Sequence, residues 1–102
     1  MAQLNKVRIS QRAANKLDQL LTFLVNEWGS KVKDDFLNKL QESFVHIRNF
    51  PELAENSRQF PDLRRVVVTK QTVYLYRFKN GFIEVIALFD TRMDPKRLKK
   101  ML

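Results

Sequence analysis

The chain has 102 residues, 44% of them hydrophobic, which suits one domain with a single packed core and excludes a disordered tail. It contains no cysteine, which excludes a disulfide scaffold and a thiolate metal site. Nineteen lysines and arginines against eleven acidic residues leave a net charge of +8, so we expect one domain over residues 1–102 with an anionic partner.

The first predicted elements are a short strand and a helix. Leu4–Ile9 alternates in character, which favours a strand, and Ser10 offers a side-chain oxygen that can cap the following helix. Leucines then recur at spacings of three and four up to Trp28, which places them on one helical face. Gly29 is expected to end this helix, because glycine adopts a positive φ without a steric penalty.

A second helix is predicted immediately afterwards, with Ser30 as its cap. Its expected apolar face consists of Phe36, Leu37, Leu40, Phe44 and Ile47. Pro51 should end it, because a proline pushes the preceding residue out of helical geometry. The two helices are therefore expected to form an antiparallel hairpin, followed by an irregular loop over residues 51–62.

From residue 63 the hydrophobic period changes from helical to alternating, which predicts three strands. They are Leu63–Thr69, Thr72–Phe78 and Phe82–Phe89, and Asn80-Gly81 between the last two is typical of a β-hairpin turn. The predicted fold is therefore α+β, in the order β-α-α-β-β-β. The helical hairpin should pack on one face of a mainly antiparallel, curved sheet.

The last two predicted strands carry apolar residues on both faces, although the helical hairpin can cover only one. In Phe82–Phe89 every residue except Glu84 is apolar, and residues 73–76 are apolar or aromatic throughout. Either neighbouring strands and long side chains shield the second face, or a partner chain covers it.

The basic residues concentrate at both ends of the chain. Residues 1–16 hold four bases and no acid, and residues 58–102 hold eleven bases and four acids, whereas residues 17–57 have a net charge of −3. If the two ends meet in space, the fold has one basic side. No apolar N-terminal segment indicates secretion, and no apolar run is long enough to span a membrane, so we expect a cytoplasmic protein without membrane partners.

Six pieces of the sequence, in this order, resemble the RelE/ParE superfamily of toxins from type II toxin–antitoxin systems. They are VRIS (residues 7–10), Trp28-Gly29, FPEL (50–53), LRRVVV (63–68), VYLY (73–76) and IALFDTR (86–92). The resemblance covers nearly the whole chain. It implies a growth-inhibiting toxin encoded beside an antitoxin whose acidic C-terminal segment wraps it, and such a segment would cover the second apolar face.

The superfamily contains two kinds of toxin. RelE-like members are ribosome-dependent ribonucleases, which need a general base, a general acid and cations, whereas ParE-like members poison DNA gyrase through contacts. The resemblance places one basic position of the ribonucleases on Val73, and residues 93–102 contain neither tyrosine nor histidine. Arg64 and Arg92 do match family cations. Cations without an acid–base partner favour the ParE-like branch, with gyrase as the target.

Two alternatives remain. The first is a RelE-like messenger-RNA endonuclease acting on the ribosome, for which Arg64, Arg92 and Tyr76 would be the catalytic residues. The second is a degenerate member without toxicity. Oligomeric state is left open between a homodimer and a toxin–antitoxin hetero-oligomer.

The expected surface for the target or the antitoxin consists of Arg64, Tyr74, Tyr76, Arg77, Thr91, Arg92, Lys96 and Arg97. The tyrosines could offer stacking faces, although aromatic residues on a strand more often belong to the core. No cofactor and no metal are expected, because the sequence has no glycine-rich phosphate loop and no cluster of ligand residues around its single histidine, His46.

Overall fold

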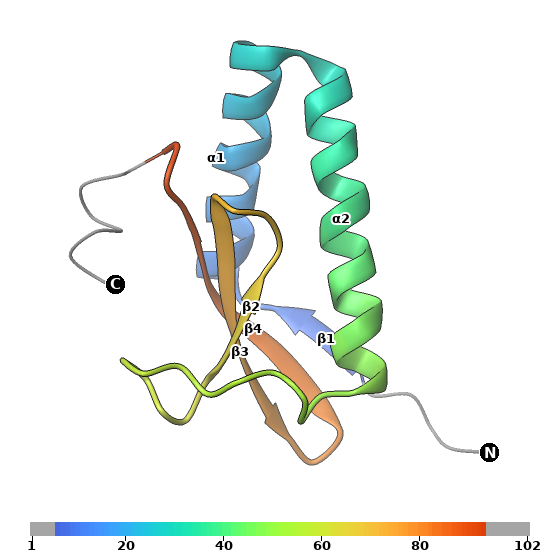
Figure 1. The fold of residues 1–102 in the computed structure, drawn as a ribbon, viewed down its shortest axis with the longest axis vertical. Helices are drawn as coiled ribbons and strands as arrows, with labels where there is room; N and C mark the ends of the chain where they lie inside the picture. Colours follow the sequence, from blue (N-terminus) through green and yellow to red (C-terminus); the bar gives the residue numbers. More distant parts are fainter. Residues whose placement is uncertain (1–5, 94–102) are drawn as a thin grey trace.

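Two antiparallel helices stand on one side of a four-stranded sheet in the computed structural model, which describes residues 6–93 (Figure 1). The elements are β1 (Lys6–Ile9), α1 (Gln11–Trp28), α2 (Ser30–Asn49), β2 (Arg64–Val67), β3 (Thr72–Lys79) and β4 (Phe82–Asp90). The predicted α+β order is confirmed. The beginning of the predicted first strand, residues 4 and 5, lies outside the described residues.

The strands lie in the order β1-β4-β3-β2, which brings the two ends of the chain together in the sheet. β1 is parallel to β4, and β3 is antiparallel to both of its neighbours, so the sheet is mainly antiparallel. An irregularity between Leu75 and Tyr76 shifts the register of β3 against β4. A bulge of this kind increases the local twist and bends the sheet.

Two small residues, Ser10 and Gly29, set the start and end of α1 and the start of α2. Ser10 caps α1 as predicted, because its Oγ accepts a hydrogen bond from the backbone N–H of Ala13 at 3.1 Å. Gly29, with φ of 90°, ends α1 and donates its N–H to the carbonyl of Val25. The prediction for Ser30 is wrong: α2 begins at Ser30 itself, Gly29 occupies the cap position, and no side chain caps this helix.

The core lies between the helices and the sheet. Its fully buried large side chains come from both layers: Leu20, Leu24, Leu40, Ile47, Tyr74, Tyr76, Ile83 and Val85. Trp28, which the helical spacing placed on the apolar face, is 52% exposed. No helix within residues 6–93 is both long and apolar enough to cross a membrane.

The face of the sheet that points away from the helices, here called the outer face, is only partly apolar. Leu75 is buried although it lies outside the core cluster, while Val67 and Phe82 are 55% and 47% exposed. Neighbouring side chains therefore shield the centre of the outer face from solvent, at Leu75. They leave its margins exposed, at Val67 and Phe82.

Candidate functional surfaces

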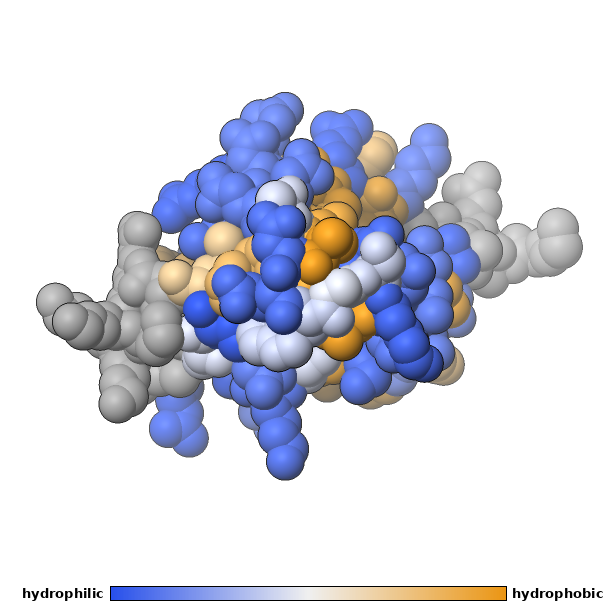
Figure 2. All heavy atoms as spheres, turned by 90° about the horizontal axis from the view of Figure 1, so that it is seen from above, coloured by the Kyte–Doolittle hydropathy of each residue, from blue (hydrophilic) through white to orange (hydrophobic). Residues whose placement is uncertain are grey.

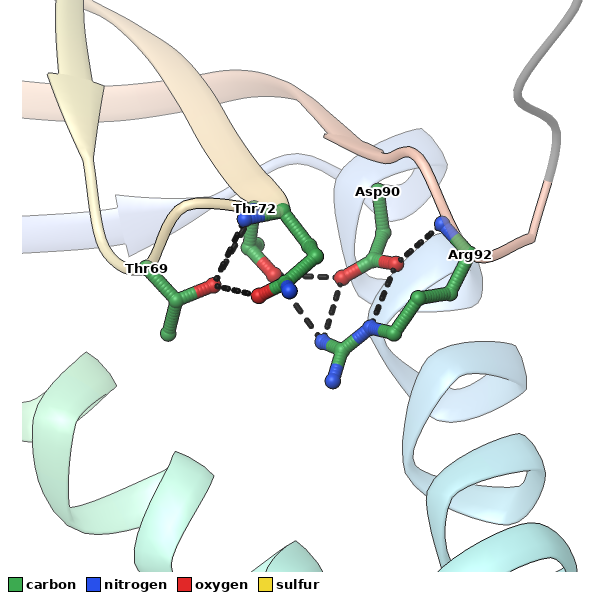
Figure 3. Close-up of polar contacts among 5 residues, drawn as sticks. Thr69, Thr72, Asp90 and Arg92 are labelled. Carbon is green, nitrogen blue, oxygen red and sulfur yellow. Dashed lines mark hydrogen bonds and ion pairs between the residues drawn. The ribbon is translucent and has the colours of Figure 1, made fainter.

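Asp90, the last residue of β4, is the centre of a buried polar cluster (Figure 3). Its carboxylate is inaccessible to solvent and pairs with Arg92, whose Nε lies 3.0 Å from Oδ1 and whose Nη2 lies 2.7 Å from Oδ2. The backbone N–H of Arg92 also donates to Oδ1, and the hydroxyl of Thr72 donates to Oδ2. This two-pronged pairing is the strongest form of an arginine–carboxylate interaction.

The same cluster connects three parts of the chain. Thr69 accepts the backbone N–H of Thr72 through its hydroxyl, which holds the turn between β2 and β3. The backbone N–H of Thr91 donates to the carbonyl of Gln71 at 2.9 Å, so this turn is tied to the end of β4. The Arg92 guanidinium lies 5.8 Å from the centre of the Trp28 ring, at the end of α1. Thr69, Thr72, Asp90 and Arg92 are called the Asp90 cluster below.

The sequence placed Arg92 on a surface for the target or antitoxin. In the structure its charge is neutralised by Asp90, and its donors are directed to Asp90 and Thr72. The partner Asp90 was not singled out from the sequence. The available signal was an acidic residue at an inward-facing strand position, two residues before an arginine.

Tyr74 and Tyr76 lie on the helix-facing side of β3, and both side chains are fully buried. Their expected stacking faces are therefore covered, because the Tyr74 ring packs edge-on against Phe44 and its hydroxyl shares a hydrogen bond with Ser43 of α2. Burial raises the pKa of Tyr74 to about 12, although the hydrogen bond with Ser43 acts against this. The expectation that these tyrosines present stacking surfaces is wrong, and they belong to the core.

Arg64 and Tyr76 are paired across β2 and β3, and both hold the loop that follows α2. The Arg64 Nη1 donates to the carbonyls of Glu52 and Ala54 at 2.9 and 2.7 Å, while the Tyr76 hydroxyl donates to the carbonyl of Pro51. Burial raises the pKa of Tyr76, and the nearby Arg64 charge lowers it by a smaller amount. A buried hydroxyl that already donates to a carbonyl is poorly placed to act as a general acid or base.

The remaining expected residues do not form one site. Arg77 is exposed on the outer face of the sheet, on the opposite side from Tyr76. Thr91 is tied through its backbone to the turn after β2. Lys96 and Arg97 lie outside the described residues. The structure therefore brings Arg64 to Tyr76 and Arg92 to Asp90, and it separates both pairs from Arg77.

A groove of about 440 Å³ runs between α2 and β2. Its lining combines His46, Ile47 and Phe50 with Val66 and Val67 of β2 and with Val68, which follows the strand. Leu53, which also lines the groove, is 68% exposed, and Phe50 is exposed as well.

β2 is an edge strand, but the loop after α2 already pairs with its first half, because Asn56 bridges Arg64 and the Arg65 N–H donates to the Glu55 carbonyl. An extended segment can therefore place apolar side chains in the groove and pair only with the edge of β2 beyond Arg65.

A second apolar area lies where α1 passes into α2. Figure 2 looks at the molecule from this end and shows hydrophobic side chains gathered in the middle, with hydrophilic side chains around them. The exposed large apolar residues of this connection are Val25, Trp28 and Val32. Trp28 also contacts Phe23 and Arg92, so part of this area is covered within the chain.

Comparison with protein families gives a match over almost the whole described chain. The model of the ParE toxin of type II toxin–antitoxin systems (parDE) matches residues 7–95. No curated protein sequence matches the chain.

Solved structures with the same fold come from several toxin–antitoxin systems. The chromosomal ParDE system from P. aeruginosa superposes with a TM-score of 0.72 at 15% identity, covering 85% of this chain and 96% of that one. The intact RelBE complex from E. coli gives a TM-score of 0.58 at 17% identity, covering 84% and 95%. A YoeB/ParE toxin from Agrobacterium tumefaciens gives 0.59 at 12% identity, covering 83% and 96%. At these identities the likeness concerns the fold.

Proposed function

The chain belongs to the ParE toxin family of type II toxin–antitoxin systems, and we propose that it arrests growth by binding and poisoning DNA gyrase in the cytoplasm. The observation that carries this proposal is the state of the residues a ribonuclease would need. Tyr76 is buried and bound to the Pro51 carbonyl, Arg64 is bound to loop carbonyls, and Arg92 is paired with Asp90.

Cleavage of RNA through its 2′-hydroxyl needs an accessible base and an accessible acid besides cations. Neither tyrosine of the chain is accessible, and residues 94–102 contain no tyrosine or histidine. His46, the only histidine, lies on α2 and lines the groove, and its ring contact is with Phe50 and not with Arg64 or Arg92. Arg64, Tyr76 and Arg92 therefore support a toxin that acts by binding its target and not by cleaving RNA.

A cognate antitoxin is the second partner in the proposal. The ParDE and RelBE structures are toxin–antitoxin systems, and this chain shares their fold. The groove between α2 and β2 offers an apolar lining to an extended antitoxin segment, which can also pair with the edge of β2 beyond Arg65, where the loop after α2 no longer pairs with the strand. In that arrangement the antitoxin covers the edge of the sheet beside α2, and the centre of the outer face needs no cover.

Gyrase supercoiling of relaxed plasmid by the purified full-length toxin tests the proposal. We expect supercoiling to be lost and linear DNA to accumulate as toxin is added. The control is the same toxin mixed beforehand with the small acidic protein encoded by the adjacent reading frame, which should restore supercoiling.

Two results contradict the proposal. Unchanged supercoiling at toxin excess, with codon-phased cuts in ribosome-bound message seen by primer extension, identifies a RelE-like ribonuclease. Unchanged supercoiling, no cuts and no growth arrest on expression identify a member that has lost toxicity.

A further inference from the structure

The outer face of the sheet carries two cross-strand rows of charged and aromatic residues at the end where β3 turns into β4. In one row Phe82 lies between Lys6 of β1 and Lys79 of β3. In the next row Glu84 lies between Arg8 and Arg77. Residues two apart on a strand share a face, so all six side chains point away from the helices. They are called the outer basic patch.

The patch gathers basic residues that the sequence places at opposite ends of the chain. Lys6 and Arg8 come from the N-terminal basic segment, and Arg77 and Lys79 come from the C-terminal one. All four cations are exposed. None of them forms an ion pair within the described chain, where the pairs are Lys33 with Asp34 and Arg92 with Asp90. The expected basic side of the fold is therefore present on the sheet, with one carboxylate among four cations.

An aromatic ring stands in the middle of these cations. Phe82 is about half exposed, and the Arg8 guanidinium lies 5.6 Å from its ring centre. Together with Glu84, Arg77 and Lys79 they line a shallow depression of about 180 Å³. The guanidinium lies over one face of the ring, so a nucleic-acid base can stack on the part of Phe82 that stays exposed or on the outer side of the guanidinium.

The spacing of the cations suits a nucleotide strand. Residues two apart on a strand are separated by about 7 Å, and β1 and β3 are separated by about 10 Å because β4 lies between them. The shorter separation is comparable to that of successive phosphates in an extended strand. We propose that the outer basic patch binds single-stranded nucleic acid, with phosphates at Lys6, Arg8, Arg77 and Lys79 and a base stacked at Phe82.

An acidic peptide fits the patch less well. The backbones of β3 and β4 pair with each other, and β1 pairs with β4, so a peptide lying across the patch gains no backbone hydrogen bonds from the middle of the sheet. A nucleotide strand supplies both regularly spaced charges and flat rings. This surface is separate from the Asp90 cluster and from the groove beside α2, and the inference stands whether or not gyrase is the target.

Fluorescence anisotropy with the full-length toxin and a labelled oligothymidylate measures this binding directly, without gyrase. Four phosphate contacts predict a fall in affinity of about 50-fold between 50 and 200 mM salt. The Arg77→Gln, Lys79→Gln double variant should keep about half of this salt dependence and bind more weakly by about tenfold or more at low salt. The matched control is Arg12→Gln with Lys31→Gln, which removes two exposed charges from the helices and should change binding less than twofold.

Two single variants separate the ring and the carboxylate from general charge. Phe82→Leu keeps every charge and should weaken binding about tenfold through lost stacking. Glu84→Gln removes the one negative charge and should strengthen binding several-fold. Each substituted side chain is exposed or half-exposed, so the variants should fold, and circular dichroism checks that they do.

The proposal is overturned if the helix control weakens binding as much as the patch variant, because binding then follows total charge. It is also overturned if Phe82→Leu has no effect and a poly-glutamate peptide competes as well as the oligonucleotide, which indicates an acidic protein partner. Equal affinity for a labelled duplex and for the single strand also contradicts the proposal. Measuring oligouridylate beside oligothymidylate shows whether the patch prefers RNA or DNA.

Discussion

Arginines at the two ends of the sheet differ in whether they pair with an acid. At one end Arg92 lies 5.8 Å from the Trp28 ring and forms a two-pronged pair with the buried Asp90. At the other end Arg8 lies 5.6 Å from the Phe82 ring, and the nearest acidic neighbour in register, Glu84, makes no ion pair with it. The first arginine ties the end of β4 to the turn after β2, and the second is exposed and forms no ion pair within residues 6–93.

The difference shows that cation count alone does not locate a binding surface. Both arginines lie beside aromatic rings and both belong to segments rich in basic residues. What separates them is the position of the acid, because an inward-facing carboxylate must be paired whereas an outward-facing one is stabilised by water. The four predictions that follow test this separation, beginning with the largest effect.

Removing the buried carboxylate should produce the largest loss of stability. Asp90→Ala leaves the Arg92 guanidinium and the Thr72 hydroxyl without their acceptor, and we expect the free energy of unfolding to fall by about 3 kcal/mol in urea denaturation. The matched control is Asp34→Ala at the exposed pair with Lys33, which should cost less than about 0.5 kcal/mol. Equal losses in the two variants would show that the Asp90 cluster is no more than a surface pair.

Strong alkali should weaken the fold through Tyr74. The pKa of this tyrosine is about 12 in the folded chain and about 10 in the unfolded chain, so the unfolded state releases its proton first. Stability is therefore retained below pH 10 and falls by roughly 2 to 3 kcal/mol as the pH rises from 10 to 12. Denaturation at a series of pH values measures the slope. Tyr74→Phe should reduce the slope, leaving the part that comes from Tyr76, whose pKa burial also raises. An unchanged slope in that variant would contradict the assignment.

Loss of the Tyr76 hydroxyl should have a smaller effect. Tyr76→Phe removes the hydrogen bond to the Pro51 carbonyl and should lower the free energy of unfolding by about 1 kcal/mol. If the toxin acts on gyrase by binding, as proposed, growth arrest on expression should persist, because the hydroxyl then only supports a loop. A folded Tyr76→Phe protein that no longer arrests growth would favour the ribonuclease alternative.

The smallest effect on stability is expected in the outer basic patch. The Arg77→Gln, Lys79→Gln double variant removes two exposed charges that pair with no acid in the described chain, so the free energy of unfolding should change by less than about 0.5 kcal/mol. Thermal melting measures this change. A loss comparable with that of Asp90→Ala would remove the distinction between the two ends of the sheet.

Much of the fold followed from local chemistry in the sequence. Alternation, the Asn80-Gly81 turn and the leucine spacing predicted each strand and helix, and Ser10 caps α1 as expected. The parallel pairing of β1 with β4 lay beyond the local patterns, because it depends on how the helical hairpin returns the chain to the sheet. The predicted cap at Ser30 failed because the connection is one residue shorter, and Gly29 alone makes the turn.

The candidate site was less predictable than the fold. Alternation indicates which residues share a face, but it does not say which face the helices cover, so Tyr74 and Tyr76 were expected as binding residues when they lie in the core. The role of Arg92 depends on Asp90 facing inward, which is again a property of the tertiary packing. The outer basic patch requires the register of three strands from both ends of the chain.

The most direct test of the account is gyrase supercoiling by equal concentrations of folded wild-type and Tyr76→Phe toxin, since it asks whether the toxin acts by binding alone. We expect both proteins to inhibit supercoiling with the same concentration dependence. Inhibition by neither protein, together with cleavage of ribosome-bound message by the wild type and not by Tyr76→Phe, would contradict it.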